Sequence, residues 1–455
     1  MKIEKKINCT WEACMTIVEK LRLKFPKFIQ NAERAGIEIT TQRLDSILDN
    51  SENYTFKHTK IYSDNTYESI LNVPSEVEKN YYFEMLRSLG KEVNEKEEKD
   101  SFFEEAIPND RNFSCEISGI SDVFIAHILN YMLEQEDSYS IHNLWSLLPR
   151  MIFENDNKPF KTIEDYILYR FKYNFITLKI KSKEKHNYKF FKEIKNSYLF
   201  EYMCKYNLPI TTQRKEQNKL FTKLYNNRRF SFYNKEKSEI NPERKYNAEL
   251  IIHFKKAMTT EDISTKYLAF YHILEYFFDT VYNQNIVESV KSWFRDPQID
   301  LSDDQTILEW VESIRKFKGK SIEDGQGNEA EAFKFVLKQF VVFDKFKAKL
   351  KMYTKDRLLK DYGIIIAERD LLEFYKRNTV DYIGEGLKID FSNDETIIKT
   401  IQKRVYAIRN SLVHSKDSYI FKSFNPYDDE TTLKKEIFLI KLLAIEIITE
   451  SSENI

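Results

Sequence analysis

Glycine and proline are scarce in this chain of 455 residues, with nine of each. So few helix-breaking residues favour long helices over many short strands. The four cysteines include no C-x-x-C pair and no cysteine at metal-ligand spacing from a histidine, so we interpret them as reduced thiols. The sequence contains no signal peptide and no apolar run approaching 18 residues. It therefore predicts a soluble, cytoplasmic protein that does not enter a membrane.

Neither positive nor negative charge is in excess, since the chain has 71 basic and 72 acidic residues. Net charge therefore identifies no class of partner, and only the distribution of charge can. Phenylalanine and tyrosine are abundant, so a sizeable core can form. The length suggests about three domains, which we place at 1–110, 111–245 and 246–455.

The N-terminal half is expected to be mostly helical with a few short strands. A helix is predicted over 11–25, where apolar residues recur at steps of three and four until Pro26. The acidic stretch 92–110 is predicted to be an exposed linker. Strands are predicted at 112–118 and 174–180, with a helix over 122–135.

A basic, aromatic-rich band covers residues 172–245, where 19 Lys or Arg stand against 7 Glu and no Asp. Such a band suits RNA, because cations displace counterions from phosphates and rings stack on bases. The alternative is a solvated helix face whose aromatic residues are buried. The predicted RNA-binding residues are Lys181, Lys183, Lys185, Lys189, Arg228 and Arg229.

The C-terminal part reads as a series of helices, so the whole chain is predicted to be mainly α. An aromatic stripe runs along 260–284, in a helix that Thr260 or Ser264 could cap, and His272 flanks it without a partner visible in the sequence. Further helices are predicted at 284–295, at 303–317 behind a Ser302–Gln305 capping box, at 329–351, near 355–377 and at 431–450.

One late helix, "NDETIIKTIQKRVYAIRNSLVHS", carries an unusual polar set. Ser392 and Glu395 fit a capping box at its start. Its apolar residues at steps of four and three form one buried stripe: Ile397, Ile401, Val405, Ile408 and Leu412. Asn410 and His414 share a face about 150° away from that stripe, with Arg409 at its flank. We therefore expect both to face solvent, a second protein surface or a ligand.

The segment "RNSLVH" resembles the R-x4–6-H motif of HEPN-domain ribonucleases, and "KYLAFYHILEYFF" resembles the aromatic helix of the Apea-like HEPN group. The resemblance covers about 246–290 and 393–450. An insertion at about 291–392 departs from the short HEPN core, and the N-terminal half resembles nothing we recognise. In this group an acidic residue of the aromatic helix packs near the motif, and Glu275 takes that position.

This resemblance implies a HEPN-like helical bundle and a metal-independent endoribonuclease without a cofactor. The implied catalytic residues are Arg409, Asn410 and His414, with Glu275 organising the motif. The residue types suit the reaction, since imidazole transfers protons near neutral pH and guanidinium binds phosphate oxygens. One motif supplies one histidine, so the family pairs two motif helices in a homodimer. Prokaryotic antiphage defence or toxicity is the implied setting, and the implied products carry 2′,3′-cyclic phosphate and 5′-hydroxyl ends.

Three alternatives remain open from the residues themselves. Arg409 could pair with Glu275 or Asp417 and merely hold the bundle together, while Asn410 and His414 form an inconsequential polar face. The chain could be a non-catalytic RNA-binding protein or scaffold. It could also be a subunit of a defence complex, in which the Asn410–His414 face docks a different protein.

Overall fold

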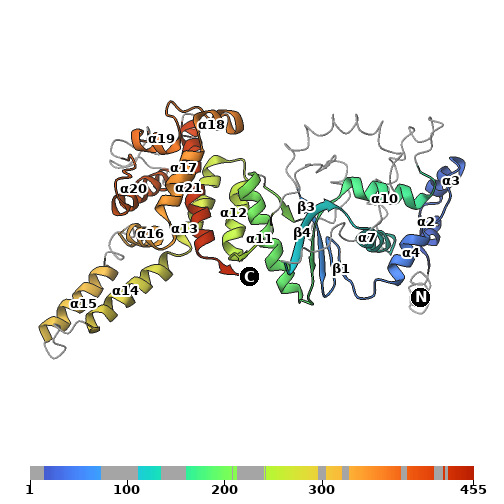
Figure 1. Ribbon diagram of the computed structural model, residues 1–455, viewed down its shortest axis with the longest axis horizontal. Helices are drawn as coiled ribbons and strands as arrows, with labels where there is room; N and C mark the ends of the chain where they lie inside the picture. Colours follow the sequence, from blue (N-terminus) through green and yellow to red (C-terminus); the bar gives the residue numbers. More distant parts are fainter. Residues whose placement is uncertain are drawn as a thin grey trace. The chain divides into compact units, whose positions relative to one another are not determined.

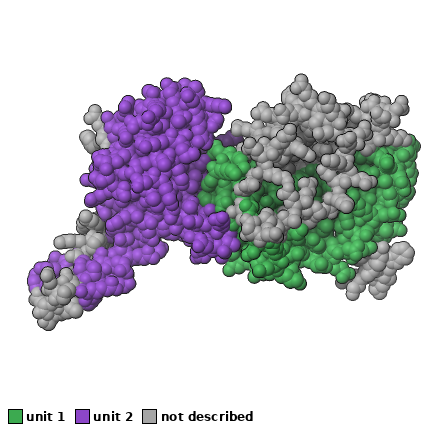
Figure 2. All heavy atoms as spheres, viewed as in Figure 1, with its two compact units in different colours: residues 1–242 green, residues 243–455 purple. Residues whose placement is uncertain are grey.

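The computed structural model divides the chain into two compact units, residues 1–242 and 243–455, which are considered separately (Figure 2). It describes residues 15–72, 111–134, 160–207, 209–212, 240, 242–295, 304–319, 327–380, 387–413, 424–425 and 429–455. The predicted linker at 92–110 and the first residues of the predicted helix at 11–25 lie outside this set.

The first unit is built on one antiparallel sheet (Figure 1). Its strands are β1 (Thr55–Lys57), β2 (Lys60–Tyr62), β3 (Thr66–Asn72), β4 (Phe113–Gly119), β5 (Ile176–Ser182) and β6 (Thr211–Thr212). The order across the sheet is β1-β2-β3-β5-β4, with β6 pairing β3. Its helices are α2 (Ile17–Lys24), α3 (Pro26–Arg34), α4 (Gln42–Asp49), α7 (Asp122–Glu134), α10 (Ile163–Asn174) and α11 (Tyr188–Tyr206).

Helices cover both faces of this sheet, as the alternation along its strands requires. Tyr67 and Ile180 are opposite each other in the β3–β5 ladder and belong to the same buried cluster as residues of α11. Ile61 and Ile70 point to the other face and belong to a cluster with α2, α3, α4, α7 and α10. The sheet is therefore the middle layer of the first unit.

The structure confirms the strands and the helix predicted in this unit and corrects one domain boundary. The predicted strands correspond to β4 and β5, and the predicted helix at 122–135 corresponds to α7. Strands β1, β2 and β3 were missed, and β1 and β2 have only three residues each, which is too few to show a periodicity. Since β3 pairs with β5, the predicted boundary after residue 110 would divide a single sheet. The second predicted boundary, after residue 245, lies three residues from the observed one.

The second unit is helical apart from a short pairing of β7 (Arg244–Lys245) with β8 (Glu453–Asn454). Its helices are α12 (Ala248–Thr259), α13 (Ile263–Glu275), α14 (Phe278–Arg295), α15 (Asp304–Gly319), α16 (Gly327–Phe340), α17 (Phe343–Met352), α18 (Lys355–Tyr362), α19 (Leu371–Arg377), α20 (Asp394–Val413) and α21 (Glu430–Glu450). Helix α13 packs against α12 and α21, and α20 packs against α13 and α16. The prediction of a mainly α chain is confirmed.

Several predicted helices are shorter than their apolar patterns suggested. The aromatic helix ends at Glu275 and a new helix starts at Phe278. The predicted helix at 329–351 is divided into α16 and α17 at the extended residue Val342. The predicted helix near 355–377 is divided because Gly363 adopts φ +64°, the left-handed conformation that ends α18. Of the predicted Ser302–Gln305 capping box, Ser302 lies outside the described residues.

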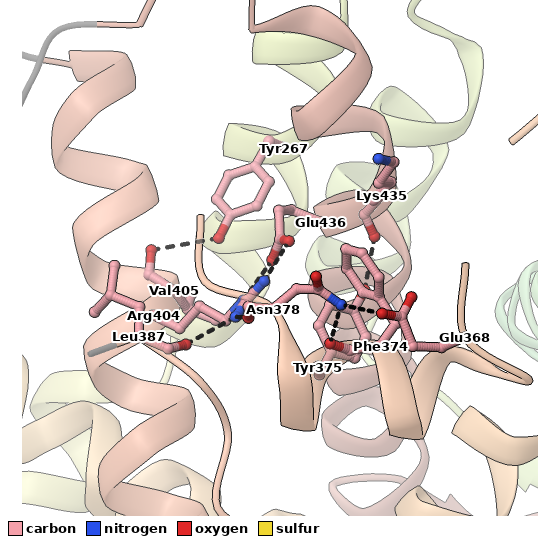
Figure 3. Close-up of polar contacts among 10 residues, drawn as sticks. All are labelled: Tyr267, Glu368, Phe374, Tyr375, Asn378, Leu387, Arg404, Val405, Lys435 and Glu436. Carbon is pink, nitrogen blue, oxygen red and sulfur yellow. Dashed lines mark hydrogen bonds and ion pairs between the residues drawn. The ribbon is translucent and has the colours of Figure 1, made fainter. Parts of the chain in front are cut away.

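A buried ion pair joins α20 to α21, as Figure 3 shows. Both side chains are at most 1% exposed, and Arg404 donates through Nε and Nη2 to the two carboxylate oxygens of Glu436, at 2.9 and 2.7 Å. Its Nη1 donates to the carbonyl oxygens of Asn378 and Leu387, each at 2.8 Å. Burial lowers the pKa of Arg404, but the charge and hydrogen bonds of Glu436 outweigh it and raise that pKa. The pair therefore ties α20 and α21 to the segments after α19.

Among the described residues, no helix is long and apolar enough to cross a membrane.

Removing one partner of this ion pair should destabilise the protein strongly. Arg404→Met leaves the Glu436 carboxylate buried without its cation, and we expect a loss of about 3–5 kcal/mol in the free energy of unfolding. The double variant Arg404→Met/Glu436→Leu should lose less, because neither buried charge remains. Urea unfolding of the full chain measures both values.

The matched control is Arg357→Ala, which removes an exposed partner of Asp361 and should change stability by about 0.5 kcal/mol or less. If Arg404→Met and Arg357→Ala unfold at the same urea concentration, the buried pair does not hold the bundle as described.

Candidate functional site

Helices α13 and α20 bring the predicted site residues together. Asp262 starts α13 by accepting a hydrogen bond from the Thr265 backbone N–H at 2.6 Å, so neither of the predicted caps, Thr260 and Ser264, fills that role. The hydroxyl of Tyr267 donates to the carbonyl oxygen of Val405 at 3.3 Å, which links the two helices (Figure 3). Helices α13 and α20 are therefore in direct contact at these residues.

The start of α20 differs by one residue from its prediction. Asn393, rather than Ser392, accepts the hydrogen bond from the Thr396 backbone N–H, at 2.9 Å. The helix therefore begins at Asp394, and the predicted Ser392–Glu395 capping box is corrected. The predicted apolar stripe is otherwise present, since Ile397, Ile401, Val405 and Ile408 are fully buried and Leu412 is half-buried.

Arg409 lies at the edge of the bundle with its side chain 19% exposed. Its Nη1 donates to Oδ1 of Asn410 at 3.1 Å, and its Nη2 lies 4.0 Å from a carboxylate oxygen of Glu329 on α16. Its guanidinium carbon lies 5.6 Å from the ring centroid of Tyr271, a cation–π contact. Of the two partners considered from the sequence, Glu275 lies close enough for its pKa to be lowered by Arg409, whereas Asp417 lies outside the described residues.

Asn410 is buried at 2% exposure, so the expectation that it faces solvent or a partner is wrong. That expectation came from the angle between Asn410 and the apolar stripe, and it assumed that other helices cover only one side of α20. In the structure α16 covers α20 as well, and Arg404, Tyr406 and Ala407 are buried along with the stripe. Asn410 thus supports Arg409 from inside the bundle.

Tyr406 lies beside the residues that contact Arg409. Burial is the main cause that raises its pKa, and Asn410, Glu329 and Arg409 all lie near enough to influence that pKa. The Arg409–Asn410 hydrogen bond and the Arg409–Glu329 ion pair hold the guanidinium from two sides. Contacts on two sides restrict the orientation of the guanidinium.

The aromatic ring of Tyr271 lies against the Arg409 guanidinium, and Tyr271 is 1% exposed. Its hydroxyl has no hydrogen-bond partner among the described residues, and burial raises its pKa. Glu275, Glu329 and Arg409 all lie near enough to influence that pKa. The sequence placed Tyr271 in an apolar stripe, which is correct for its ring but gives no information on its hydroxyl.

A second imidazole lies in this site, which the sequence analysis did not find. Nδ1 of His272 lies 2.8 Å from a carboxylate oxygen of Glu275, three residues later on α13. That hydrogen bond is the main cause that lowers the pKa of Glu275, and the charges of His272, Arg409 and His253 lower it further while burial opposes them. The ring of His253 on α12 lies 5.7 Å from that of His272, and the two ring planes are tilted by 49°. The i, i+3 spacing of His272 and Glu275 was the available signal.

His414, the last residue of the motif, lies outside the described residues. Helix α20 is described as far as Val413, whose side chain is 48% exposed. The structure therefore brings together Arg409, Asn410 and Glu275 of the predicted site.

The predicted RNA-binding residues belong to the first unit, and four of the six are described. Lys181 is half-buried within β5, whereas Lys183, Lys185 and Lys189 are exposed. Lys185 pairs with Asp64 at 3.2 Å. Arg228 and Arg229 lie outside the described residues. The exposed lysines thus lie where β5 ends and α11 begins.

A further set of residues joins cations and rings there, which we call the Tyr188 patch. Nζ of Lys60 lies 4.6 Å from the ring centroid of Tyr188 and Nζ of Lys57 lies 5.9 Å from it. The rings of Tyr62 and Tyr188 are 4.8 Å apart. Lys57 and Lys60 come from β1 and β2, which the sequence analysis had not predicted, so their proximity to α11 could not be foreseen.

Within the parts of the chain that the structure describes, no three His, Cys, Asp or Glu side chains are arranged to hold a metal ion.

Comparison with known proteins gave no match to a family model, to a curated protein or to a solved structure.

The site geometry makes a prediction that separates Asn410 from Arg409. Asn410→Ala removes a buried partner of Tyr406 and Arg409, so we expect a loss of about 1–3 kcal/mol in the free energy of unfolding. Arg409→Ala removes a partly exposed side chain with one hydrogen bond, and should cost about 1 kcal/mol or less. Thermal and urea unfolding of the two variants beside wild type test this order. A larger loss from Arg409→Ala would mean that Arg409 mainly holds the bundle together.

Proposed function

We propose that this chain is a metal-independent endoribonuclease whose active site is centred on Arg409 and His414. The observation that supports this most is the position of Arg409: it is partly exposed, oriented by buried Asn410, and close to a carboxylate–imidazole pair on α13. This is the arrangement that a HEPN-like ribonuclease would need at its motif.

The chemistry assigns each residue a role. Arg409 binds the scissile phosphate and stabilises the negative charge that develops as the 2′-oxygen attacks phosphorus. His414 transfers a proton, because imidazole exchanges protons near neutral pH. Asn410 and Glu275 are positioning residues, since Asn410 accepts a hydrogen bond from the guanidinium and Glu275 contacts His272 on α13. The products carry 2′,3′-cyclic phosphate and 5′-hydroxyl ends.

The proposal extends to a homodimer, in which two copies of α20 line one RNA-binding cleft, and to a role as a prokaryotic antiphage-defence or toxin effector in the cytoplasm. The resemblance of "RNSLVH" to the HEPN motif supports these parts. Two-fold symmetry would place two copies of Arg409 on one RNA strand.

The central test is incubation of the full chain with total RNA in EDTA. Wild type should fragment the RNA, and Arg409→Ala and His414→Ala should each slow cleavage by about 10²-fold or more, because each removes one catalytic group. Arg409→Lys should stay impaired, since lysine lacks the forked donor geometry. The rate of loss of a labelled oligonucleotide and the chemistry of its new ends measure the effect.

Two matched controls accompany this test. Arg357→Ala removes an exposed arginine of α18 and His127→Gln replaces a histidine of α7 that stacks on Phe56 in the first unit, and both should cleave as wild type does. Intact RNA after incubation with wild type would contradict the proposal, as would full activity in Arg409→Ala.

A second candidate function is RNA binding without catalysis, and the Tyr188 patch favours it. Partly exposed rings beside lysines resemble the stacking platforms that bind single-stranded nucleic acid. The exposed lysines Lys183, Lys185 and Lys189 would neutralise phosphates next to it.

Substitution in the Tyr188 patch tests this second candidate. Tyr188→Ala should weaken binding of single-stranded RNA by about 5–100-fold, because stacking on one base contributes about 1–3 kcal/mol. Lys57→Glu should weaken it further and reduce its salt dependence. Lys27→Glu, an exposed lysine of α3, is the control. Equal affinity of Tyr188→Ala and Lys27→Glu, measured by fluorescence anisotropy, would exclude this surface.

A further inference from the structure

A histidine with a carboxylate partner lies within the charged surroundings of Arg409. Nδ1 of His272 and the Glu275 carboxylate are 2.8 Å apart, and the His272 side chain is 47% exposed. We propose that His272, oriented by Glu275, is a second proton-transfer group of the proposed active site and comes from the same chain as Arg409. This inference rests on the function proposed above and supplies a second imidazole, which one R-x4-H motif lacks.

The hydrogen bond to Glu275 determines which nitrogen of His272 is available. A carboxylate only accepts hydrogen bonds, so Nδ1 carries the proton and donates it. In the neutral ring Nε2 then has the free electron pair and can accept a proton from substrate. A base oriented by a hydrogen-bonded carboxylate is a recurring arrangement in active sites. Glu275 is thus a positioning residue for His272.

A second imidazole, His253, lies beside His272. Its ring lies 5.7 Å from that of His272, and its Nδ1 is buried without a hydrogen-bond partner among the described residues. Burial is the main cause that lowers the pKa of His253, and the charge of His272 lowers it further. His253 therefore packs beside His272 without adding a second exposed cation to the site.

The surroundings of this pair point to a phosphodiester with a hydroxyl nucleophile. Arg409 is a partly exposed cation that lies near enough to Glu275 to lower the pKa of its carboxyl, after the larger effect of the His272 hydrogen bond. A guanidinium near an imidazole base can bind the phosphate of a substrate while the imidazole takes the proton of its hydroxyl.

The proposed step is a balanced transfer of protons. The 2′-oxygen of RNA attacks phosphorus, and its proton passes to Nε2 of His272 as the new P–O bond forms. The bond from phosphorus to the 5′-oxygen breaks, its electron pair stays on that oxygen, and the oxygen takes the proton held by His414. His272 then returns its proton to water and His414 regains one, so no proton is consumed overall.

Imidazole rescue tests the catalytic role. We expect His272→Gly to slow RNA cleavage by about 10²-fold or more, and added imidazole to restore part of the rate, because the free base can enter the space left by the side chain. Glu275→Gln should slow cleavage by a smaller factor, since the ring remains but loses its orienting charge. His127→Gly, which removes a ring that stacks on Phe56 in the first unit, is the matched control and should cleave normally with or without imidazole.

A binding measurement keeps this inference distinct from the proposed ribonuclease function. With ¹³C-labelled histidine in the full chain, single-stranded DNA serves as a probe that lacks the 2′-hydroxyl and cannot be cut by this step. We expect the His272 and His253 signals to shift on its addition, the signal of His127, a half-buried residue of α7 in the first unit, to stay unchanged, and the shifts to disappear in Arg409→Ala.

Each result has a separate meaning. Cleavage by wild type and equally by His272→Gly would overturn the role of His272 while leaving the ribonuclease standing. Loss of cleavage that imidazole does not restore, together with a lowered melting temperature, would make His272 a structural residue. If wild type does not cleave RNA, both the ribonuclease function and the catalytic role of His272 are wrong. Shifted histidine signals would in that case identify only a site that binds the phosphates of a nucleic acid.

Discussion

The second unit depends on the buried pair of Arg404 and Glu436, because this pair fixes how α20 lies against α21. Two buried charges are costly to desolvate, and here every donor that points inward has an acceptor. Arg404 and Arg409 are five residues apart and therefore about 140° apart around the helix. With Arg404 locked toward α21, Arg409 must lie on the side that meets α13 and α16. The position of the candidate site thus follows from an ion pair that takes no part in it.

Around Arg409 the residues divide into buried supports and partly exposed groups. Asn410, Tyr406 and Tyr271 are buried, whereas Arg409, Glu275 and His272 reach the surface. Rigid support beneath exposed polar groups keeps their geometry fixed before a ligand arrives, which lowers the entropy that binding would otherwise cost. This arrangement costs stability at the Tyr271 hydroxyl, which is buried without a hydrogen-bond partner among the described residues.

The sequence predicted what depends on local periodicity and missed what depends on distant neighbours. The stripe from Ile397 to Ile408 and the proximity of Glu275 to Arg409 could be predicted, because helix geometry and one family resemblance sufficed. The burial of Asn410 could not, since it follows from α16 covering a second side of α20. The same holds for Glu329, which lies 80 residues before Arg409, and for the sheet, in which β1, β2 and β6 have only two or three residues each.

Arg404 shows how an arginine with a purely structural role is bonded in this bundle, and Arg409 can be compared with it. It is fully buried and makes four hydrogen bonds, two of them to one carboxylate. Arg409 is partly exposed, makes one hydrogen bond to a described residue, and has its nearest carboxylate at 4.0 Å. A guanidinium has five N–H donors, so most of those on Arg409 make no hydrogen bond to a described residue. An arginine that only held helices together would stabilise the fold more if these donors made hydrogen bonds within the protein. This difference from Arg404 is the physical reason to look for an anion bound at Arg409.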